Sequence, residues 1–219
     1  MNKRSHVKVT VGVLALVITV LVAGFVHRMM QPVIFNKQKM ESYGAIIYDK
    51  PRIFRDIQLL GHDKKPFTKA AFVGKWTFVF FGFTSCPDVC PTTMGVLNKL
   101  YKELQGKHES DDFQVVLVTV DPARDTPEKL REYVTYFNPL FMGVTGDYMD
   151  LVKFSADLNA GFTKVPLPDG NYTMEHSGDI AVINPRGDYH GLFRPPFDPL
   201  RLRFAFDSMR EQYKRDYGK

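Results

Sequence analysis

Residues 76–91 read WTFVFFGFTSCPDVCP, an apolar run that ends in the only two cysteines of the chain. An uncharged, aromatic and Val-containing run of this length is typical of a strand that is buried on both faces of a sheet. A helix is predicted to follow over Thr92–Gln105, so Cys86 and Cys90 fall at a strand-to-helix turn. Because a helix N-terminus favours the ionised form of a nearby thiol, this position predicts a redox-active pair or a soft-metal site.

The two cysteines are spaced C-x-x-x-C, which helps to choose between these chemistries. On one helical face, the Cβ atoms of residues i and i+4 lie about 5–6 Å apart. A disulfide requires a Cβ separation of roughly 3.5–4.5 Å, whereas a metal that binds each sulfur at roughly 2.3 Å spans a wider gap. The spacing therefore favours chelation slightly, and a disulfide remains possible if Cys86 precedes the helix. The alternative of two structural cysteines is disfavoured by the flanking prolines and Asp88.

The rest of the chain alternates between predicted strands and helices, with no internal repeat. Strands are predicted over residues 53–60, 75–82, 113–120 and 142–144, helices over 92–105, 127–137, 147–158 and 198–217, a loop over 166–171, and a hairpin from 180–184 and 188–193. This order predicts an α/β fold with a thioredoxin-like mixed sheet flanked by helices and an added hairpin.

Residues 9–26 read VTVGVLALVITVLVAGFV, with no charge, and are preceded by Lys3, Arg4 and Lys8. The length is near the lower limit for a membrane span, and a cleaved signal peptide is the competing interpretation. Residues 22–24 form a poor cleavage site, so we expect an uncleaved single-pass anchor of a bacterial inner membrane. The expected organisation is a cytoplasmic tail (1–8), the transmembrane anchor (9–26), a juxtamembrane connector (27–51) and a periplasmic domain (52–219).

Charge and composition exclude some partners. The formal net charge is +5, without a block of like charges, and no zinc-finger or basic, aromatic-interleaved motif occurs. We therefore expect no nucleic-acid partner. In an oxidising compartment, a lone cysteine pair forms a disulfide unless it binds a metal or is kept reduced by another protein.

Two thiolates leave a metal under-coordinated, so a third ligand is expected among the histidines. The six are His6, His27, His62, His108, His176 and His190. The first two flank the membrane segment, and His62 and His108 lie in predicted turns. His176 lies in MEHSG (174–178), before a predicted strand that in a thioredoxin-type fold starts beside the cysteines. An imidazole there would complete a Cys2His site for Cu(I) and Cu(II); the alternative is a hydrogen-bonded loop histidine.

Three segments together resemble one known family. GFTSCPDVCP (82–91), VTVDPARDTPEKL (118–130) and EHSG (175–178) are similar in order and spacing to the SCO/SenC family of copper-binding assembly proteins. The resemblance implies that Cys86, Cys90 and His176 bind copper in a membrane-anchored, thioredoxin-like domain. It also implies a role in assembling the dinuclear copper centre of cytochrome c oxidase subunit II, as metal donor, thiol reductant or both. The implied partners are that subunit, a copper donor protein and a thioredoxin-like reductant.

A copper chaperone has alternatives in other functional classes. The main alternative is an extracytoplasmic thiol–disulfide oxidoreductase with Cys86 and Cys90 as the catalytic pair, acting on cysteines of the oxidase subunit or another protein. Such exchange has no need of His176, and the wider cysteine spacing also disfavours it. A thiol peroxidase would place a hydroxyl three residues before its cysteine, where this chain has Phe83; a copper sensor or buffer is a further alternative. Met94 is expected in the core, and Asp121 is expected to fix a local turn.

Overall fold

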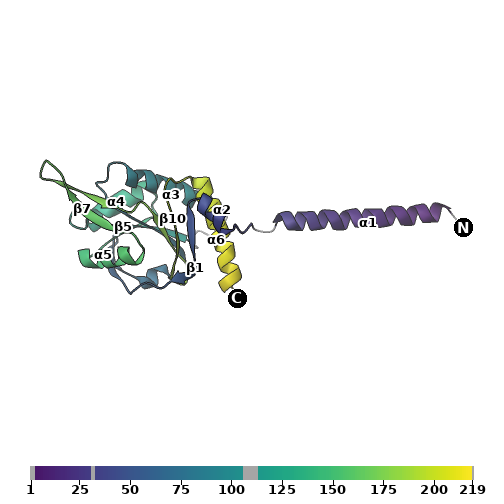
Figure 1. The fold of residues 1–219 in the computed structure, drawn as a ribbon, viewed down its shortest axis with the longest axis horizontal. Coiled ribbons are helices and arrows are strands. Elements are labelled where there is room, and N and C mark those ends of the chain that lie inside the picture. Colours follow the sequence, from purple (N-terminus) through teal and green to yellow (C-terminus); the bar gives the residue numbers. More distant parts are fainter. Residues whose placement is uncertain (1–2, 31–32, 106–112, 219) are drawn as a thin grey trace. The chain divides into compact units, whose positions relative to one another are not determined.

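The computed structural model describes residues 3–30, 33–105 and 113–218. Phe35–Met209 forms one compact unit, and Met1–Ile34 is grouped with Arg210–Lys219 in a second. Helix α1 (Lys3–Met30) is drawn in purple in Figure 1. Its segment Lys8–Met29 is long and apolar enough to cross a membrane and has no buried residue. The predicted N-terminal apolar helix is therefore confirmed.

The compact unit is built on a mixed sheet of eight strands in the order β1-β10-β9-β4-β5-β6-β2-β3. The strands are β1 (Ala45–Arg52), β2 (Gln58–Gly61), β3 (Pro66–Thr68), β4 (Trp76–Gly82), β5 (Phe113–Thr119), β6 (Met142–Thr145), β9 (Ile180–Ile183) and β10 (Tyr189–Phe193). Strands β4, β5 and β6 are parallel, and β9 runs antiparallel to β4. The predicted mixed sheet and its added hairpin, β9–β10, are confirmed.

Helices cover both faces of this sheet. They are α2 (Lys37–Ser42), α3 (Val89–Gln105), α4 (Pro127–Phe137), α5 (Tyr148–Asp157) and α6 (Pro199–Tyr217), with the short 3-10 helix η1 (Lys69–Phe72). Alternate residues of β4 point to opposite faces. Accordingly, Phe78 packs against Phe206 of α6 at a ring distance of 4.8 Å, and Phe81 packs against Phe154 of α5 at 5.7 Å. Every residue of β4 is buried, as the uncharged run predicted.

The start of the sheet differs from the prediction. The prediction of a strand over residues 53–60 is wrong for residues 53–57, because the strand β2 comprises only Gln58–Gly61. Residues 53–57 instead cross the surface and bury Phe54 and Ile57. Within the segment expected as a connector, Ala45–Arg52 forms β1, which pairs with β10 from Ala45↔Phe193 onward. Backbone hydrogen bonds to a strand far along the chain hold this segment in the sheet.

A second hairpin was not predicted. Residues 166–171 were expected as a loop, but the loop is flanked by β7 (Phe162–Pro166) and β8 (Tyr172–His176), which pair as a separate two-stranded sheet. Figure 1 shows this hairpin extending beyond the main sheet at the end of the unit where β7 is labelled. His176 is the last residue of β8, so the hairpin positions it.

Candidate metal centre

The loop between β4 and α3 positions both cysteines. Its turn is closed by the Cys86 N–H, which donates to the carbonyl oxygen of Phe83 at 3.2 Å. Cys90 lies in the first turn of α3, and its N–H donates to the Cys86 sulfur at 3.4 Å. The first amides of a helix have no partner within the helix, so this sulfur caps one of them. Both cysteines are free thiols, and Cys86 precedes the helix, the position in which a disulfide stays possible.

Cys90 packs directly against the end of the strand. A Cβ atom added to Gly82 would lie 2.9 Å from the Cys90 sulfur and 3.0 Å from Cε1 of Phe80. A glycine is therefore required at position 82 for the helix to approach so closely. Cys90 is fully buried, whereas Cys86 is half-buried.

The β7–β8 hairpin brings His176 to the two sulfurs. Its Nε2 lies 3.5 Å from the Cys90 sulfur, and the three candidate ligand atoms of Cys86, Cys90 and His176 all lie within 4.8 Å of one another. Nδ1 of His176 lies 2.9 Å from the carbonyl oxygen of Ser177. Because a carbonyl oxygen only accepts, Nδ1 carries the proton, and the Nε2 lone pair of the neutral ring faces the Cys90 thiol and becomes available to a metal when the thiol proton leaves.

Burial of the Cys90 sulfur and partial burial of the His176 ring change the protonation of these two ligands. Burial raises the pKa of the Cys90 thiol well above its ordinary value of 9.0, with the neighbouring Cys86 adding to the effect. The acidification expected from the helix N-terminus is therefore wrong for Cys90, because loss of hydration outweighs the helix dipole. Burial also lowers the pKa of His176. At neutral pH the metal-free site thus holds a neutral thiol at Cys90 and a neutral imidazole.

Two aromatic rings hold the imidazole. Phe80 and Phe83 pack edge-to-face with His176, at ring distances of 5.8 and 6.0 Å. Phe80 comes from β4, and Phe83 from the loop that carries Cys86. The same aromatic run that forms the central strand therefore also shapes the pocket for the third ligand.

A buried carboxylate that the sequence analysis missed supports the cysteine loop. Asp125 is 1% exposed. It accepts hydrogen bonds from the Thr84 N–H at 3.0 Å, the Thr84 hydroxyl at 2.6 Å and the Thr119 hydroxyl at 2.6 Å. These bonds tie the loop before Cys86 to the end of β5. The sequence offers one signal for this contact. Thr84 and Asp125 lie in two of the segments that carry the family resemblance, 82–91 and 118–130.

Asp121 does more than fix a local turn. It is 3% exposed, pairs with Arg124, and accepts a hydrogen bond from the Tyr172 hydroxyl of β8 at 2.9 Å. It therefore links the loop after β5 to the hairpin, a contact between residues far apart in the sequence. The expected core position of Met94 is confirmed, since this side chain is fully buried.

The remaining histidines do not join the site in the part of the chain that the structure describes. Nδ1 of His62 accepts a hydrogen bond from the Gly143 N–H at 3.0 Å, which gives it a role in holding the fold. His190 packs edge-to-face with Trp76 at 5.2 Å. His108 lies outside the described residues.

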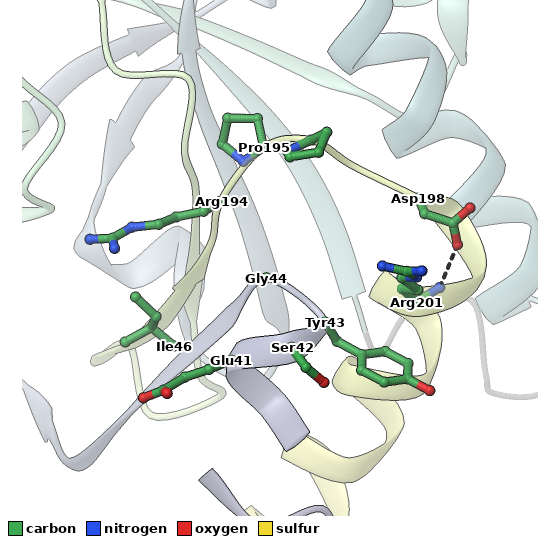
Figure 2. Close-up of a pocket in the computed structure, with 10 residues that line it drawn as sticks. Glu41, Ser42, Tyr43, Gly44, Ile46, Arg194, Pro195, Asp198 and Arg201 are labelled. Carbon is green, nitrogen blue, oxygen red and sulfur yellow. Dashed lines mark hydrogen bonds between the residues drawn. The ribbon is translucent and has the colours of Figure 1, made fainter. Parts of the chain in front are cut away.

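A cavity of about 500 Å³ lies elsewhere, among the end of α2, the start of β1 and the start of α6. Figure 2 shows the acidic side chains of Glu41 and Asp198 in the same lining as Arg194 and Arg201. Asp198 already accepts a hydrogen bond from the Arg201 N–H at 2.9 Å. This cavity contains none of the predicted site residues and no concentration of one charge.

Comparison with known proteins agrees with the geometry. Residues 47–205 match the SCO1/SenC family. A protein of Stutzerimonas stutzeri that carries a copper-binding description is 34% identical over 157 residues, which cover 72% of this chain and 76% of that protein. The mouse mitochondrial SCO2 homologue is 35% identical over 64% of this chain and 56% of its own length. The crystal structure of Arabidopsis thaliana ScoI with copper bound is 28% identical, with a TM-score of 0.69 over 74% of this chain and 99% of that chain.

Proposed function

Because the chain belongs to the SCO1/SenC family, we propose that it is a membrane-anchored copper chaperone. Copper is its cargo, held by the Cys86 and Cys90 sulfurs and by Nε2 of His176. The observation that carries the proposal is the convergence of these three ligand atoms within 4.8 Å of one another. Two thiolates suit Cu(I), and an added imidazole also accommodates Cu(II).

The donor set fits copper in its protonation as well as in its position. Nδ1 of His176 donates to the Ser177 carbonyl oxygen, so Nε2 carries the lone pair that faces the Cys90 sulfur and can bind a metal. The Cys90 thiol stays protonated without a metal, so binding copper requires this proton to leave. Cys86 is the more exposed sulfur and is therefore the ligand that an acceptor reaches first. Transfer would proceed by exchange of these ligands for those of the acceptor.

The proposed cellular setting follows the same reasoning. Lys8–Met29 would anchor the chain in a bacterial inner membrane as a single span, with the sheet-containing unit in the periplasm. The proposed acceptor is the dinuclear copper centre of cytochrome c oxidase subunit II. A copper donor protein and a thioredoxin-like reductant would load the site and keep its thiols reduced, since that compartment oxidises free thiols.

Copper titration of the reduced full chain in detergent micelles tests the proposal. We expect one tightly bound copper per chain and a thiolate-to-Cu(II) absorption band that is lost in His176→Ala. Met94→Leu is the matched control, because Met94 follows Cys90 by one helical turn but is a fully buried core residue. Copper binding that is indifferent to His176→Ala, or that is lost equally in Met94→Leu, would contradict the proposed site.

A thiol–disulfide oxidoreductase is the second candidate, with Cys86 and Cys90 as its catalytic pair. Two free thiols with Cys86 in the loop before the helix favour it. The same variant separates the two functions, because His176→Ala should abolish copper retention yet leave dithiol exchange with a reductant largely intact. Dithiol exchange that persists in wild type and in His176→Ala, with no tight copper binding or with copper binding unchanged by the substitution, would favour the oxidoreductase.

A further inference from the structure

We propose that Arg124, Asp121 and Tyr172 form a clamp that holds the β7–β8 hairpin in the position where His176 joins the two cysteines. In the clamp, Arg124 and Asp121 are positioning residues that act through Tyr172. This inference rests on the proposed copper site and adds a determinant of which copper oxidation state that site retains.

The hairpin needs such an anchor because the main sheet does not hold it. Among the described strands, β7 and β8 pair only with each other. Tyr172 and His176 begin and end β8, and they share one face with Met174, which is 7% exposed. Their separation along the strand is about 13 Å at roughly 3.3 Å per residue. Fixing Tyr172 therefore fixes the direction in which the strand delivers His176.

The clamp holds both the side chain and the backbone of Tyr172. The Tyr172 hydroxyl donates to Asp121 Oδ1 at 2.9 Å, and Arg124 Nη1 donates to the Tyr172 carbonyl oxygen at 3.1 Å. The guanidinium of Arg124 also lies 4.0 Å from the centre of the Tyr172 ring. Because Arg124 forms an ion pair with Asp121, the loop after β5 holds the hairpin through two linked side chains.

Arg124 also reaches the site from a second side. Its guanidinium lies 5.8 Å from the centre of the Phe83 ring, and Phe83 packs against His176 at 6.0 Å. Arg124 is therefore connected to the imidazole both through β8 and through the loop that carries Cys86. A lysine at position 124 would keep the positive charge but would lose the planar guanidinium, which donates hydrogen bonds and stacks on the Tyr172 ring at the same time.

Arg124 Nη2 is buried and has no hydrogen-bond partner among the described residues. Replacing Arg124 removes the cost of this unpaired donor, but it also leaves the buried Asp121 carboxylate without its ion-pair partner. We therefore expect Arg124→Ala to lower the overall stability of the chain as well as to release the hairpin. Tyr172→Phe keeps the ion pair and removes only the hydroxyl contact, so it separates positioning of the hairpin from stabilisation of the fold.

The consequence for copper follows from the ligands. Two thiolates satisfy Cu(I), whereas retention of Cu(II) depends on the imidazole. A hairpin that leaves its position withdraws only His176 and leaves Cys86 and Cys90 in place. The clamp should therefore determine the affinity for Cu(II) and have little effect on the affinity for Cu(I).

The test uses the full chain in detergent micelles, with Arg124→Ala, Arg124→Lys and Tyr172→Phe. Arg55→Ala is the control, because Arg55 forms a more exposed arginine–aspartate ion pair with Asp157, at 2.7 Å, and neither residue belongs to β7, to β8 or to the loop after β5. In the metal-free chain, we expect amide hydrogen exchange in β8 to rise roughly tenfold or more in Arg124→Ala and to be unchanged in Arg55→Ala. Affinity for Cu(II) should fall roughly tenfold or more while affinity for Cu(I) stays within about threefold.

Two outcomes would overturn the clamp: β8 exchange in Arg124→Ala that equals wild type, or Cu(I) and Cu(II) affinities that fall together. Tyr172→Phe, which removes only the hydroxyl contact, and Arg124→Lys keep the test decisive if Arg124→Ala does not fold. The exchange measurement needs no metal. A wild-type chain that binds no copper would therefore refute the proposed function. The amide exchange rates of β8 would still show whether the clamp holds the hairpin.

Discussion

Gly82→Ala tests the contact on which the metal centre is built. The added Cβ would lie 2.9 Å from the Cys90 sulfur, 3.0 Å from Phe80 Cε1 and 3.2 Å from Leu117 Cδ1. These neighbours come from a helix and two strands and are all buried, so none can move into solvent. Overpacking of this kind costs about 1–3 kcal/mol. For a domain of this size, the melting temperature should fall by roughly 2–12 °C, at about 2–4 °C per kcal/mol.

The same substitution at Gly95 is the control. Gly95 lies within α3, and a Cβ atom added there would have no neighbour within 4 Å. Since alanine favours a helix, Gly95→Ala should stabilise the chain by about 0.5–1 kcal/mol. Urea unfolding of the metal-free chain, followed by the fluorescence of its single tryptophan, Trp76, measures both changes.

Copper binding gives the second measurement of the same pair. Because Gly82→Ala must push the Cys90 sulfur away from the strand, it should weaken copper binding in a competition assay, whereas Gly95→Ala should not. A Gly82→Ala chain with the unfolding midpoint and copper affinity of wild type would refute the close packing of Cys90. Equal losses in the two variants would show that the effect is not specific to the site.

Four further predictions concern the supporting structure and the protonation of Cys90. Asp125→Ala removes three hydrogen bonds to a buried carboxylate, so the free energy of unfolding measured in urea should fall by about 3 kcal/mol. A fall of less than roughly 0.5 kcal/mol, as at an ordinary surface position, would contradict this. Gly191→Ala would place a Cβ atom against the carbonyl oxygen of Ile46, so amide hydrogen exchange in β1 should increase sharply. Unchanged protection of β1 would show that its pairing with β10 does not depend on a glycine at position 191. The pKa of Cys90 is raised by burial, with Cys86 and Asp125 adding to the rise, so copper affinity should fall by up to about tenfold per unit decrease in pH for each thiol proton released. By the same linkage, the metal-free chain should lose stability as the pH rises above 9.0, the ordinary pKa of the thiol, because the folded state holds the Cys90 proton more tightly than the unfolded state does. Urea unfolding of wild type and of Cys90→Ala across this pH range measures the contribution. An equal pH dependence of stability in the two chains would argue against it.

The elements that could be predicted from the sequence are those whose signals are local. The uncharged aromatic run marks β4, and Thr126 followed by Pro127 marks the start of α4, where the Thr126 side chain accepts from the Lys129 N–H. In contrast, β1 has the sequence AIIYDKPR, in which a proline and charges hide a strand. Its partner β10 lies at the other end of the unit, so pairing between distant segments determines its structure.

The same distinction applies to the metal centre. The cysteine pair is a local motif that the sequence reveals directly. The position of His176 fits a hydrogen-bonded loop histidine equally well, and only the family resemblance selects it as a ligand. The contacts of Asp121 and Arg124 with Tyr172 span 51 and 48 residues. Side-chain contacts across such separations depend on the packed fold, so spacing within one sequence could not reveal them.

The two outer strands of the main sheet have a consequence for how the protein behaves at high concentration. One edge is β1, which ends in Asp49, Lys50, Pro51 and Arg52, and the other is β3, which has only three residues and begins with Pro66. Charged side chains, prolines and short length all oppose the addition of a further strand. The main sheet is therefore protected at both of its edges against edge-to-edge aggregation.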